Sequence, residues 1–214
     1  MKIQAILFDM DGVLVEAKDW HYVALNRALE LFGLPISRLD HLTTFDGLPT
    51  RKKLEILSLE RGLPKQLHEF INEMKQRYTM ELVQTQCKPQ FVHEYALSGL
   101  KSSGYKLAVC SNSVRQTVVT MMEKSSLDQY LDFMVSNEDV KAGKPHPEMY
   151  LKAIEHFGLR PDECLVVEDN ENGIRAAQAA GAHLLVVNDV GDTNLENIMA
   201  AIRDIEATGN EVTG

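Results

Sequence analysis

The apolar residues of this chain gather in short runs that predict buried β-strands. Five such runs lie at residues 3–8, 106–110, 133–135, 164–167 and 183–187. They are rich in Val, Leu and Ile, and helix-length stretches separate most of them. Near-continuous apolar strands that alternate with helices are typical of a parallel sheet whose two faces are both covered. The pattern therefore predicts an α/β fold with helices on both faces of a mainly parallel sheet.

The interval between the first and second predicted strands is too long for one crossover helix. Apolar residues recur in it at helical spacing, first over 22–32 and again over 67–82. Gly-Leu-Pro sequences that begin at residues 33, 47 and 62 mark breaks between helices. We interpret residues 15–85 as a small all-helical domain inserted after the first strand, and residues 1–14 and 86–214 as the core.

Composition narrows the possible partners. The chain has 22 Lys and Arg against 31 Asp and Glu, a formal net charge of −9, so no broad basic field favours nucleic acid or an anionic membrane. No apolar run approaches the roughly 20 residues that span a bilayer. The three cysteines are widely spaced and form no paired motif, which is typical of reduced thiols. We expect a cytoplasmic protein, and no obligate protein partner is implied.

Polar side chains follow the predicted strands at the points where the strands end. In chain order they are Asp9 and Asp11 after the first strand, Ser111 and Asn112 after the second, Lys144 after the third, and Glu168 and Asp169 after the fourth. The carboxyl ends of parallel strands share one edge of the sheet, and ligands bind there. We therefore expect these residues, distant in sequence, to meet in space.

The residue types in this set favour phosphoryl transfer. Four neighbouring carboxylates cannot all be ionised without a cation, and hard oxygen ligands without a His or Cys cluster indicate Mg²⁺. If the strand geometry persists, Asp9 and Asp11 face the same side, so that one can attack while the other moves a proton. Lys144 supplies a positive charge, and the helix after Asn112 offers free N–H groups to an anion.

Each feature also has a plain structural interpretation when it is taken alone. An Asp-x-Asp-Gly sequence after a strand is commonly a turn, and Lys144 before a proline could be a solvated loop charge. Ser111 could be an ordinary hydroxyl at a strand end, and Asn170 could serve only as a helix N-cap. Coincidence becomes hard to sustain because the features occur together, in order, at the ends of successive strands.

These residues carry a family resemblance over nearly the whole chain. The sequence resembles the haloacid dehalogenase-like hydrolase superfamily, in particular its β-phosphoglucomutase-like phosphatases and mutases with a helical cap inserted after the first motif. The four ordered motifs that carry it lie at 9–14, 111–113, 143–148 and 167–174. The resemblance implies a Rossmann-like phosphotransfer core at 1–14 and 86–214 and a cap domain at 15–85.

The resemblance also implies a role for each matching residue. Asp9 would be the nucleophile that forms an aspartyl-phosphate, and Asp11 would be the general acid and base. Ser111, Asn112 and Lys144 would contact the substrate, with Ser111 and Lys144 on the transferring phosphoryl group. The implied Mg²⁺ ligands are the side chains of Asp9 and Asp169, the backbone carbonyl of Asp11, and Glu168 as a direct or supporting ligand.

Three further residues are candidates for gripping the substrate. Arg51 ends the segment 47–51, which resembles the substrate-selecting loop of the subgroup, and its planar guanidinium suits a second anionic group. His21 matches a His at the cap hinge of mutase-like members, and Arg115 follows the second motif. Alternatively, Arg51 belongs to a solvated basic run with Lys52 and Lys53, and the other two are exposed helix residues.

The chain departs from the family pattern at two positions. Relatives commonly carry Ser or Thr shortly after the first motif, where the hydroxyl could assist the acid/base, but residues 15–19 read Val-Glu-Ala-Lys-Asp. Val114 stands where mutase-like relatives carry Lys. The first departure leaves the control of Asp11 open, and the second weighs against a mutase.

The leading hypothesis is a Mg²⁺-dependent phosphatase that acts on a small phosphorylated metabolite, a sugar phosphate being the first candidate. A sugar phosphomutase is the alternative, although it needs a second phosphate clamp and a cap that excludes water. Dehalogenases and phosphonate-cleaving members lack the acid at the position of Asp11. A non-catalytic phosphometabolite-binding protein on a retired enzyme fold is the alternative from another class, but here the nucleophile, the acid and the metal ligands all remain.

Overall fold

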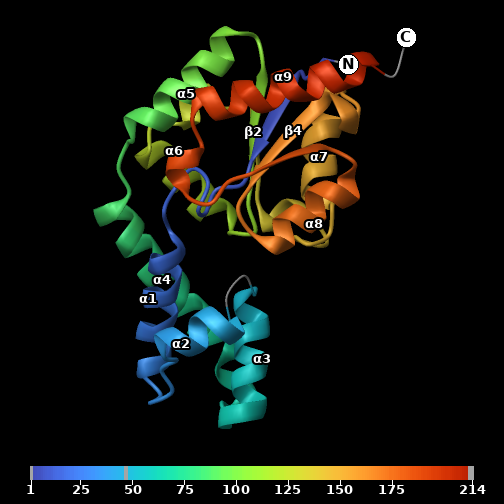
Figure 1. Cartoon of the computed structure of the whole chain (residues 1–214). Helices are drawn as coiled ribbons and strands as arrows, with labels where there is room; N and C mark the ends of the chain where they lie inside the picture. Colours follow the sequence, from blue (N-terminus) through green and yellow to red (C-terminus); the bar gives the residue numbers. More distant parts are fainter. Residues whose placement is uncertain (1, 46–47, 212–214) are drawn as a thin grey trace. The chain divides into compact units, whose positions relative to one another are not determined.

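The computed structural model of the protein describes residues 2–45 and 48–211. These residues form two compact units (Figure 1). The first comprises Met1–Glu16 and Lys88–Gly214, and the second comprises Ala17–Cys87. The inserted unit thus begins and ends two residues later than the range 15–85 expected from the pattern. The three cysteines are buried free thiols, and no helix in the described part of the chain is long and apolar enough to cross a membrane.

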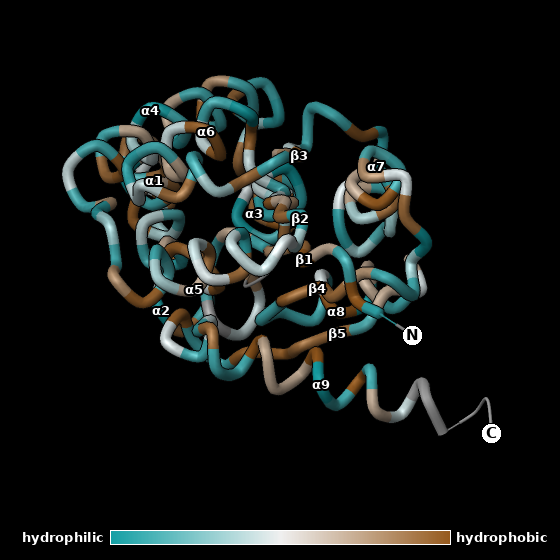
Figure 2. Tube along the Cα trace, turned by 90° about the horizontal axis from the view of Figure 1, so that it is seen from above, coloured by the Kyte–Doolittle hydropathy of each residue, from teal (hydrophilic) through white to brown (hydrophobic). Residues whose placement is uncertain are grey.

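A parallel sheet forms the centre of the first unit, as the apolar runs predict. The described residues give five strands in the order β3-β2-β1-β4-β5. Their bounds are Ala5–Phe8 (β1), Lys106–Cys110 (β2), Phe133–Val135 (β3), Cys164–Glu168 (β4) and His183–Val186 (β5). Figure 2 shows β4 and β5 as strongly hydrophobic segments. The α/β prediction is confirmed, and the central strand β1 receives a neighbour on each side.

Helices cover both faces of this sheet. The long ones are α5 (Phe91–Ser102), α6 (Arg115–Lys124), α7 (Glu148–Phe157), α8 (Glu171–Ala180) and α9 (Leu195–Glu211). Helices α7 and α8 pack together on one face, and α5 and α9 pack together on the other (Figure 1). Short helical turns join the elements: η3 (Asp128–Tyr130), η4 (Asn137–Asp139), η5 (Pro161–Glu163) and η6 (Val190–Asp192).

The alternation of side chains along the strands explains why the core needs helices on both faces. Leu7, Ala108 and Val166, level with one another in β1, β2 and β4, point to one face and pack against Tyr150 of α7 and Ala177 of α8. A fully buried apolar strand turns its alternate residues to the opposite face, which also has to be kept from water. The polar ends of the strands then remain as the open edge of the sheet.

The second unit is entirely helical in its described residues. Its elements are α1 (Lys18–Glu30), α2 (Arg38–Asp40), the π-helical turn η1 (His41–Phe45), α3 (Thr50–Arg61), η2 (Lys65–Leu67) and α4 (His68–Gln86). Helices α1 and α4 pack along each other, and α3 contributes to the same core, which includes Leu25, Leu29, Leu57 and Ile71. The apolar residues at helical spacing over 22–32 and 67–82 therefore mark the helix faces that are buried in this small core.

Candidate functional site

The register of the sheet brings the ends of three strands to one level. Phe8 of β1 lies opposite Val109 of β2 and Val167 of β4, so the residues after each of them reach the same edge together. Backbone hydrogen bonds continue past the strands, because Asp9 N donates to Val167 O at 3.0 Å and Ser111 N donates to Val135 O at 2.9 Å. The polar residues after β1, β2 and β4 are thus held on a rigid frame.

Lys144 lies at the centre of the polar cluster. Its Nζ donates to Asp9 Oδ1 at 2.7 Å and to Glu168 Oε1 at 2.6 Å. The side chains of Lys144, Asp9 and Glu168 are 3, 7 and 0% exposed. Such burial requires that each charge be paired and hydrogen-bonded. The three residues come from separate loops and strands, and the ammonium group joins them.

The charges shift one another's pKa values. Burial by itself lowers the pKa of Lys144, but the neighbouring Asp9 and Glu168 outweigh burial and raise this pKa above its ordinary value. Burial raises the pKa of Asp9 well above its ordinary value; Lys144 opposes this shift, and Glu168 and Asp11 add to it. One ammonium group therefore does not balance the carboxylates around it, and a further cation would keep Asp9 ionised.

Glu168 is held by hydrogen bonds on both of its oxygens. Oε1 accepts from Tyr150 Oη at 2.7 Å in addition to Lys144, and Oε2 accepts from Asp169 N at 3.0 Å and from the backbone and side chain of Asn170. A Cβ on Gly173 would lie 1.6 Å from Oε1, so the glycine leaves the space that this carboxylate fills. Glu168 is therefore positioned to support Lys144 and the turn that carries Asp169.

Three carboxylates of the cluster could hold a metal ion. One oxygen from each of Asp9, Glu168 and Asp169 lies within 4.8 Å of the other two. An all-oxygen donor set of this kind suits Mg²⁺, which binds through one or two carboxylates and keeps several waters. Because Glu168 already accepts several hydrogen bonds, Asp9 and Asp169 are the better placed side chains. The donor chemistry thus fits the ion that the motifs imply.

Asp11 lies on a turn and not on a continuation of the strand. β1 ends at Phe8, and the N–H groups of Leu14 and Val15 both donate to Met10 O at 2.9 Å. The strand geometry assumed for the Asp9–Asp11 pair does not persist, because the chain leaves the strand after Phe8 and enters this turn. Asp11 is half-buried, and its Oδ2 accepts a hydrogen bond from Ser113 Oγ at 3.3 Å.

The residues after β2 hold the loop that carries Lys144 in place. The buried Ser111 Oγ accepts from Ser113 N at 3.1 Å. The side chain of Asn112 pairs with the backbone of Lys144: Lys144 N donates to its Oδ1 at 2.9 Å, and its Nδ2 donates to Lys144 O at 3.2 Å. A Cβ on Gly143 would lie 2.5 Å from this Oδ1. Asn112 therefore fixes the loop that presents Lys144.

Carboxylates already occupy the start of α6. Arg115 N donates to Glu138 Oε2 at 2.8 Å, and the guanidinium group of Arg115 forms an ion pair with Asp139. The expectation that this helix offers its free N–H groups to a substrate anion is wrong at Arg115, because a side chain from the η4 turn satisfies that group first. Arg115 is bound by the same turn.

His21 and Arg51 belong to the helical unit and are described within it. His21 Nδ1, on α1, lies 3.4 Å from Lys75 Nζ on α4. The side chain of Arg51 is 89% exposed and pairs with Glu55 one turn further along α3 at 3.2 Å. Gly47, which begins the expected substrate-selecting segment, lies outside the described residues. The substrate contacts proposed for His21 and Arg51 stay predictions.

Four polar residues that contact the predicted site residues are assigned no role by the sequence pattern: Tyr150, Lys75, Ser113 and Glu138. Tyr150 could have been found, because it lies on the buried face of an amphipathic helix and a buried Tyr hydroxyl requires a partner. Lys75, on the helical repeat over 67–82, could equally have been singled out as a polar residue on a buried face. Ser113 and Glu138 gave no such signal, because their partners lie 102 and 23 residues away.

Comparison with known proteins shows which family this chain matches. The family model described as Haloacid dehalogenase-like hydrolase matches residues 6–187. A phosphorylated carbohydrates phosphatase of Thermotoga maritima is 32% identical over 195 residues, which are 89% of this chain and 88% of the relative. A phosphoglycolate phosphatase of Aquifex aeolicus is 31% identical over 179 residues, 84% of this chain and 82% of the relative.

The solved structures agree at the level of the fold. The crystal structure of β-phosphoglucomutase from Clostridium difficile matches with a TM-score of 0.81 and covers 96% of this chain and 99% of its own. Its sequence is 21% identical, a level at which the likeness speaks for the fold alone. The polar cluster at the strand ends therefore lies in a known architecture, at the edge where open parallel sheets bind ligands.

Proposed function

Because this chain belongs to the haloacid dehalogenase-like hydrolase family, we propose that it is a Mg²⁺-dependent phosphatase that hydrolyses a small phosphorylated metabolite. One observation carries the proposal: Lys144 Nζ donates hydrogen bonds to both Asp9 Oδ1 and Glu168 Oε1, at 2.7 and 2.6 Å. A buried nucleophile beside a fixed positive charge is what phosphoryl transfer requires. The carbohydrate-phosphate relative makes a sugar phosphate the first substrate class to test.

The reaction takes two displacements at phosphorus. A carboxylate oxygen of Asp9 attacks the phosphorus atom, the bond to the leaving oxygen breaks, and Asp11 gives its proton to the departing alkoxide. Asp11, now a carboxylate, takes a proton from water as the water oxygen attacks the aspartyl-phosphate. The phosphorus–Asp9 bond breaks, inorganic phosphate leaves, and both aspartates return to their starting states.

Lys144 and Ser111 stabilise the transferring group. Two of the three ammonium protons of Lys144 are donated to Asp9 and Glu168, and the third can be donated to a phosphoryl oxygen. Ser111 Oγ accepts from Ser113 N, so its own proton remains for a second phosphoryl oxygen. Asn112 keeps the Lys144 loop in the position that this arrangement needs.

Asp9 and Asp169 would hold Mg²⁺ by their side chains, with the backbone carbonyl of Asp11 as the further ligand that the family pattern implies. The ion would neutralise charge on the transferring phosphoryl group. Asp9 has to remain a carboxylate in order to attack, although burial raises its pKa. The positive charge of the ion would favour the ionised form of Asp9. Glu168, already hydrogen-bonded on both oxygens, would stay in its supporting role.

The structure weighs against the phosphomutase alternative. A mutase has to grip a second anionic group, and Arg115 is one of the residues that could do so. Its guanidinium group is paired with Asp139, and Glu138 lies on its backbone N–H. Two carboxylates at this place repel a second phosphate. Release of phosphate is therefore favoured over its return to the substrate.

The test is release of phosphate from a panel of phosphorylated metabolites in Mg²⁺ and in EDTA. We expect turnover in Mg²⁺ to fall to background in EDTA and in Asp9→Asn. Asp204→Asn, a change at an exposed carboxylate of α9, is the matched control and should keep full activity. Unchanged release in EDTA or in Asp9→Asn contradicts the proposal. Isomerisation of a sugar phosphate primed with a bisphosphate, in place of release, would identify a mutase.

A further inference from the structure

The acid/base Asp11 has a hydroxyl partner that comes from another part of the chain. No hydroxyl side chain occurs at residues 15–19, directly after the first motif. In the folded chain Ser113 Oγ lies 3.3 Å from Asp11 Oδ2, although the two residues are 102 positions apart. Both side chains are half-buried, so water competes only in part for this hydrogen bond. The long-range contact thus supplies what the local sequence lacks.

Hydrogen bonds on both sides hold the backbone of Ser113 in place. Ser113 N donates to Ser111 Oγ at 3.1 Å, and Ser113 O accepts from Asn137 N at 3.1 Å. Ser113 is therefore held between Ser111 and the η4 turn, just before α6 begins. A hydroxyl on so constrained a backbone loses little further freedom when it donates to Asp11.

The backbone around Asp11 is constrained as well. Gly12 N donates to Val15 O at 2.8 Å, and Leu14 N donates to Met10 O at 2.9 Å. Gly12 has φ = 88°, in the left-handed region that favours glycine, so the turn is closed tightly. The contact between Asp11 and Ser113 therefore joins two rigid turns and does not depend on a mobile loop.

We propose that Ser113 is a positioning residue that orients the Asp11 carboxyl group for proton exchange with the leaving group. Anchoring one oxygen of a carboxyl group fixes its plane, and the proton is then exchanged through the other oxygen. General acid catalysis depends strongly on such alignment and contributes about 10²- to 10⁴-fold. The inference rests on the proposed phosphatase function, because it concerns the acid of that reaction.

The leaving group provides the test. p-Nitrophenyl phosphate releases a weakly basic phenolate that needs little help from an acid, whereas glycerol 2-phosphate releases a basic alkoxide that needs a proton. In Ser113→Ala we expect kcat/KM for glycerol 2-phosphate, which reports steps only up to departure of the alkoxide, to fall about 10-fold, and kcat/KM for p-nitrophenyl phosphate to stay within about 2-fold. Ser113→Thr keeps the hydroxyl and should restore most of the loss.

A double-mutant cycle shows whether Ser113 acts through Asp11. In an Asp11→Ala background, Ser113→Ala should cause no further loss on glycerol 2-phosphate, because the group that it orients is gone. The matched control is Ser125→Ala, at the other end of α6, whose buried hydroxyl donates to Met121 O within its own helix. It should leave both kcat/KM values unchanged, and thermal melts confirm that each variant is folded.

The outcomes separate the two ideas. If Ser113→Ala lowers kcat/KM equally for both substrates, or lowers it by the same factor with and without Asp11, Ser113 does not position the acid and the inference is overturned while the phosphatase proposal stands. If the wild-type protein releases no phosphate from either substrate in Mg²⁺, the proposed function fails and the inference fails with it.

Discussion

Lys144 supplies the positive charge that pairs with both buried carboxylates of the cluster, Asp9 and Glu168. Its ammonium group is buried with two carboxylates, and the ring of Tyr150 lies 4.8 Å beneath it. Taking charges out of water is costly, and the cost is recovered only when every charge finds close partners. Here Lys144 has two carboxylates, and Glu168 has donors on both oxygens. The cluster is stable as a set and vulnerable to the loss of one member.

Replacement of Lys144 by Met tests this dependence. Asp9 and Glu168 would then face each other without their common cation, so we expect the free energy of unfolding in EDTA to fall by about 3 kcal/mol. Phosphate release should be lost as well. Urea unfolding and the phosphate assay give the two measurements.

The matched control for this change is Lys152→Met on α7, the helix that follows the Lys144 loop. Lys152 donates to the backbone carbonyl of Asp139 at 2.6 Å, so its loss should cost only about 1 kcal/mol. Equal destabilisation by the two substitutions would show that burial with carboxylates is not what makes Lys144 important.

At the scale of elements, the junction of β4 with α8 decides where Glu168 can go. The strand ends at Glu168, and the side chain of Asn170 caps the helix by accepting from the N–H groups of Asn172 and Gly173. The first turn of α8 therefore passes directly over the Glu168 carboxylate. Only a residue without a Cβ can occupy position 173, because the carboxylate fills that space.

Gly173→Ala should therefore displace Glu168 and disturb Lys144 through it. We expect a loss of about 2 kcal/mol in the free energy of unfolding, together with a fall in kcat, because the added methyl group overpacks a buried ion pair. Gly99→Ala is the matched control within α5. Its Cβ would meet the flexible end of Leu195 at 2.8 Å, and helix propensity favours Ala there, so stability should change by less than about 1 kcal/mol. An equally small effect at Gly173 would contradict the close fit.

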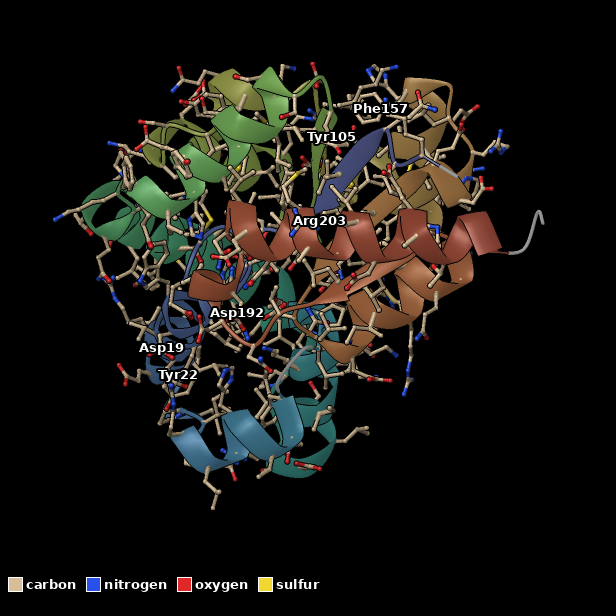
Figure 3. All side chains as sticks on the ribbon, turned by 45° about the horizontal axis from the view of Figure 1, so that its top comes forward. Asp19, Tyr22, Tyr105, Phe157, Asp192 and Arg203 are labelled. Carbon is tan, nitrogen blue, oxygen red and sulfur yellow. The ribbon has the colours of Figure 1, made fainter. Side chains whose placement is uncertain are left out.

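His93 joins α5 to the turn that follows β5. Its Nε2 lies 2.7 Å from Val190 O, in the segment where Figure 3 labels Asp192. Burial lowers the pKa of His93 below its ordinary value of 6.5, and the contact with Val190 opposes this only in part. The neutral form is therefore the one that suits the folded state.

The sign of the resulting pH dependence follows from this shift. Because protonation favours the unfolded chain, the contribution of His93 is fully present above its ordinary pKa and declines as the pH falls below it. We expect the fall in Tm between about pH 7 and pH 5 to be smaller in His93→Gln than in the wild type. His156→Gln, at an exposed position of α7, should keep the wild-type slope. An unaltered slope in His93→Gln would contradict the prediction.

At the scale of the whole molecule, the polar cluster belongs to one of the two units. Asp9, Asp11, Lys144, Glu168 and Asp169 all lie in the unit formed by Met1–Glu16 and Lys88–Gly214. His21 and Arg51 lie in Ala17–Cys87. The chemistry of phosphoryl transfer and the proposed selection of the substrate are therefore encoded in separately packed parts, and metal binding should need only the first.

Binding of Mg²⁺ should stabilise the protein in a way that needs no substrate. A ligand at a hundred times its Kd adds about 2.7 kcal/mol to the stability of the folded state, which raises Tm by roughly 5 to 10 °C for a chain of this size. Thermal melts in Mg²⁺ and in EDTA measure the shift. Asp169→Asn should abolish most of it, and Asp204→Asn should not. Equal shifts in the two variants would place the ion elsewhere.

Much of this arrangement was predictable from local sequence. The apolar runs predicted the strands, and parallel strands have their carboxyl ends at one edge, so the meeting of Asp9, Lys144 and Asp169 needed no knowledge of packing. The four motifs then indicated the family, which the comparisons confirm. The positions of the strands and the order of the motifs can be predicted from the sequence, because they depend only on hydrophobicity and on position along the chain.

The contacts between particular side chains were decided only by the tertiary structure. The sequence could not show that Tyr150 meets Glu168, that Ser113 meets Asp11, or that the η4 turn occupies the start of α6. Each contact depends on how turns and helices direct side chains that lie far apart along the chain, and a turn after Phe8 replaces the extended strand that the pattern would continue. Hydrophobic patterning by itself determined the frame of this protein and which residues reach its edge, whereas packing between distant segments determined which atoms of those residues meet.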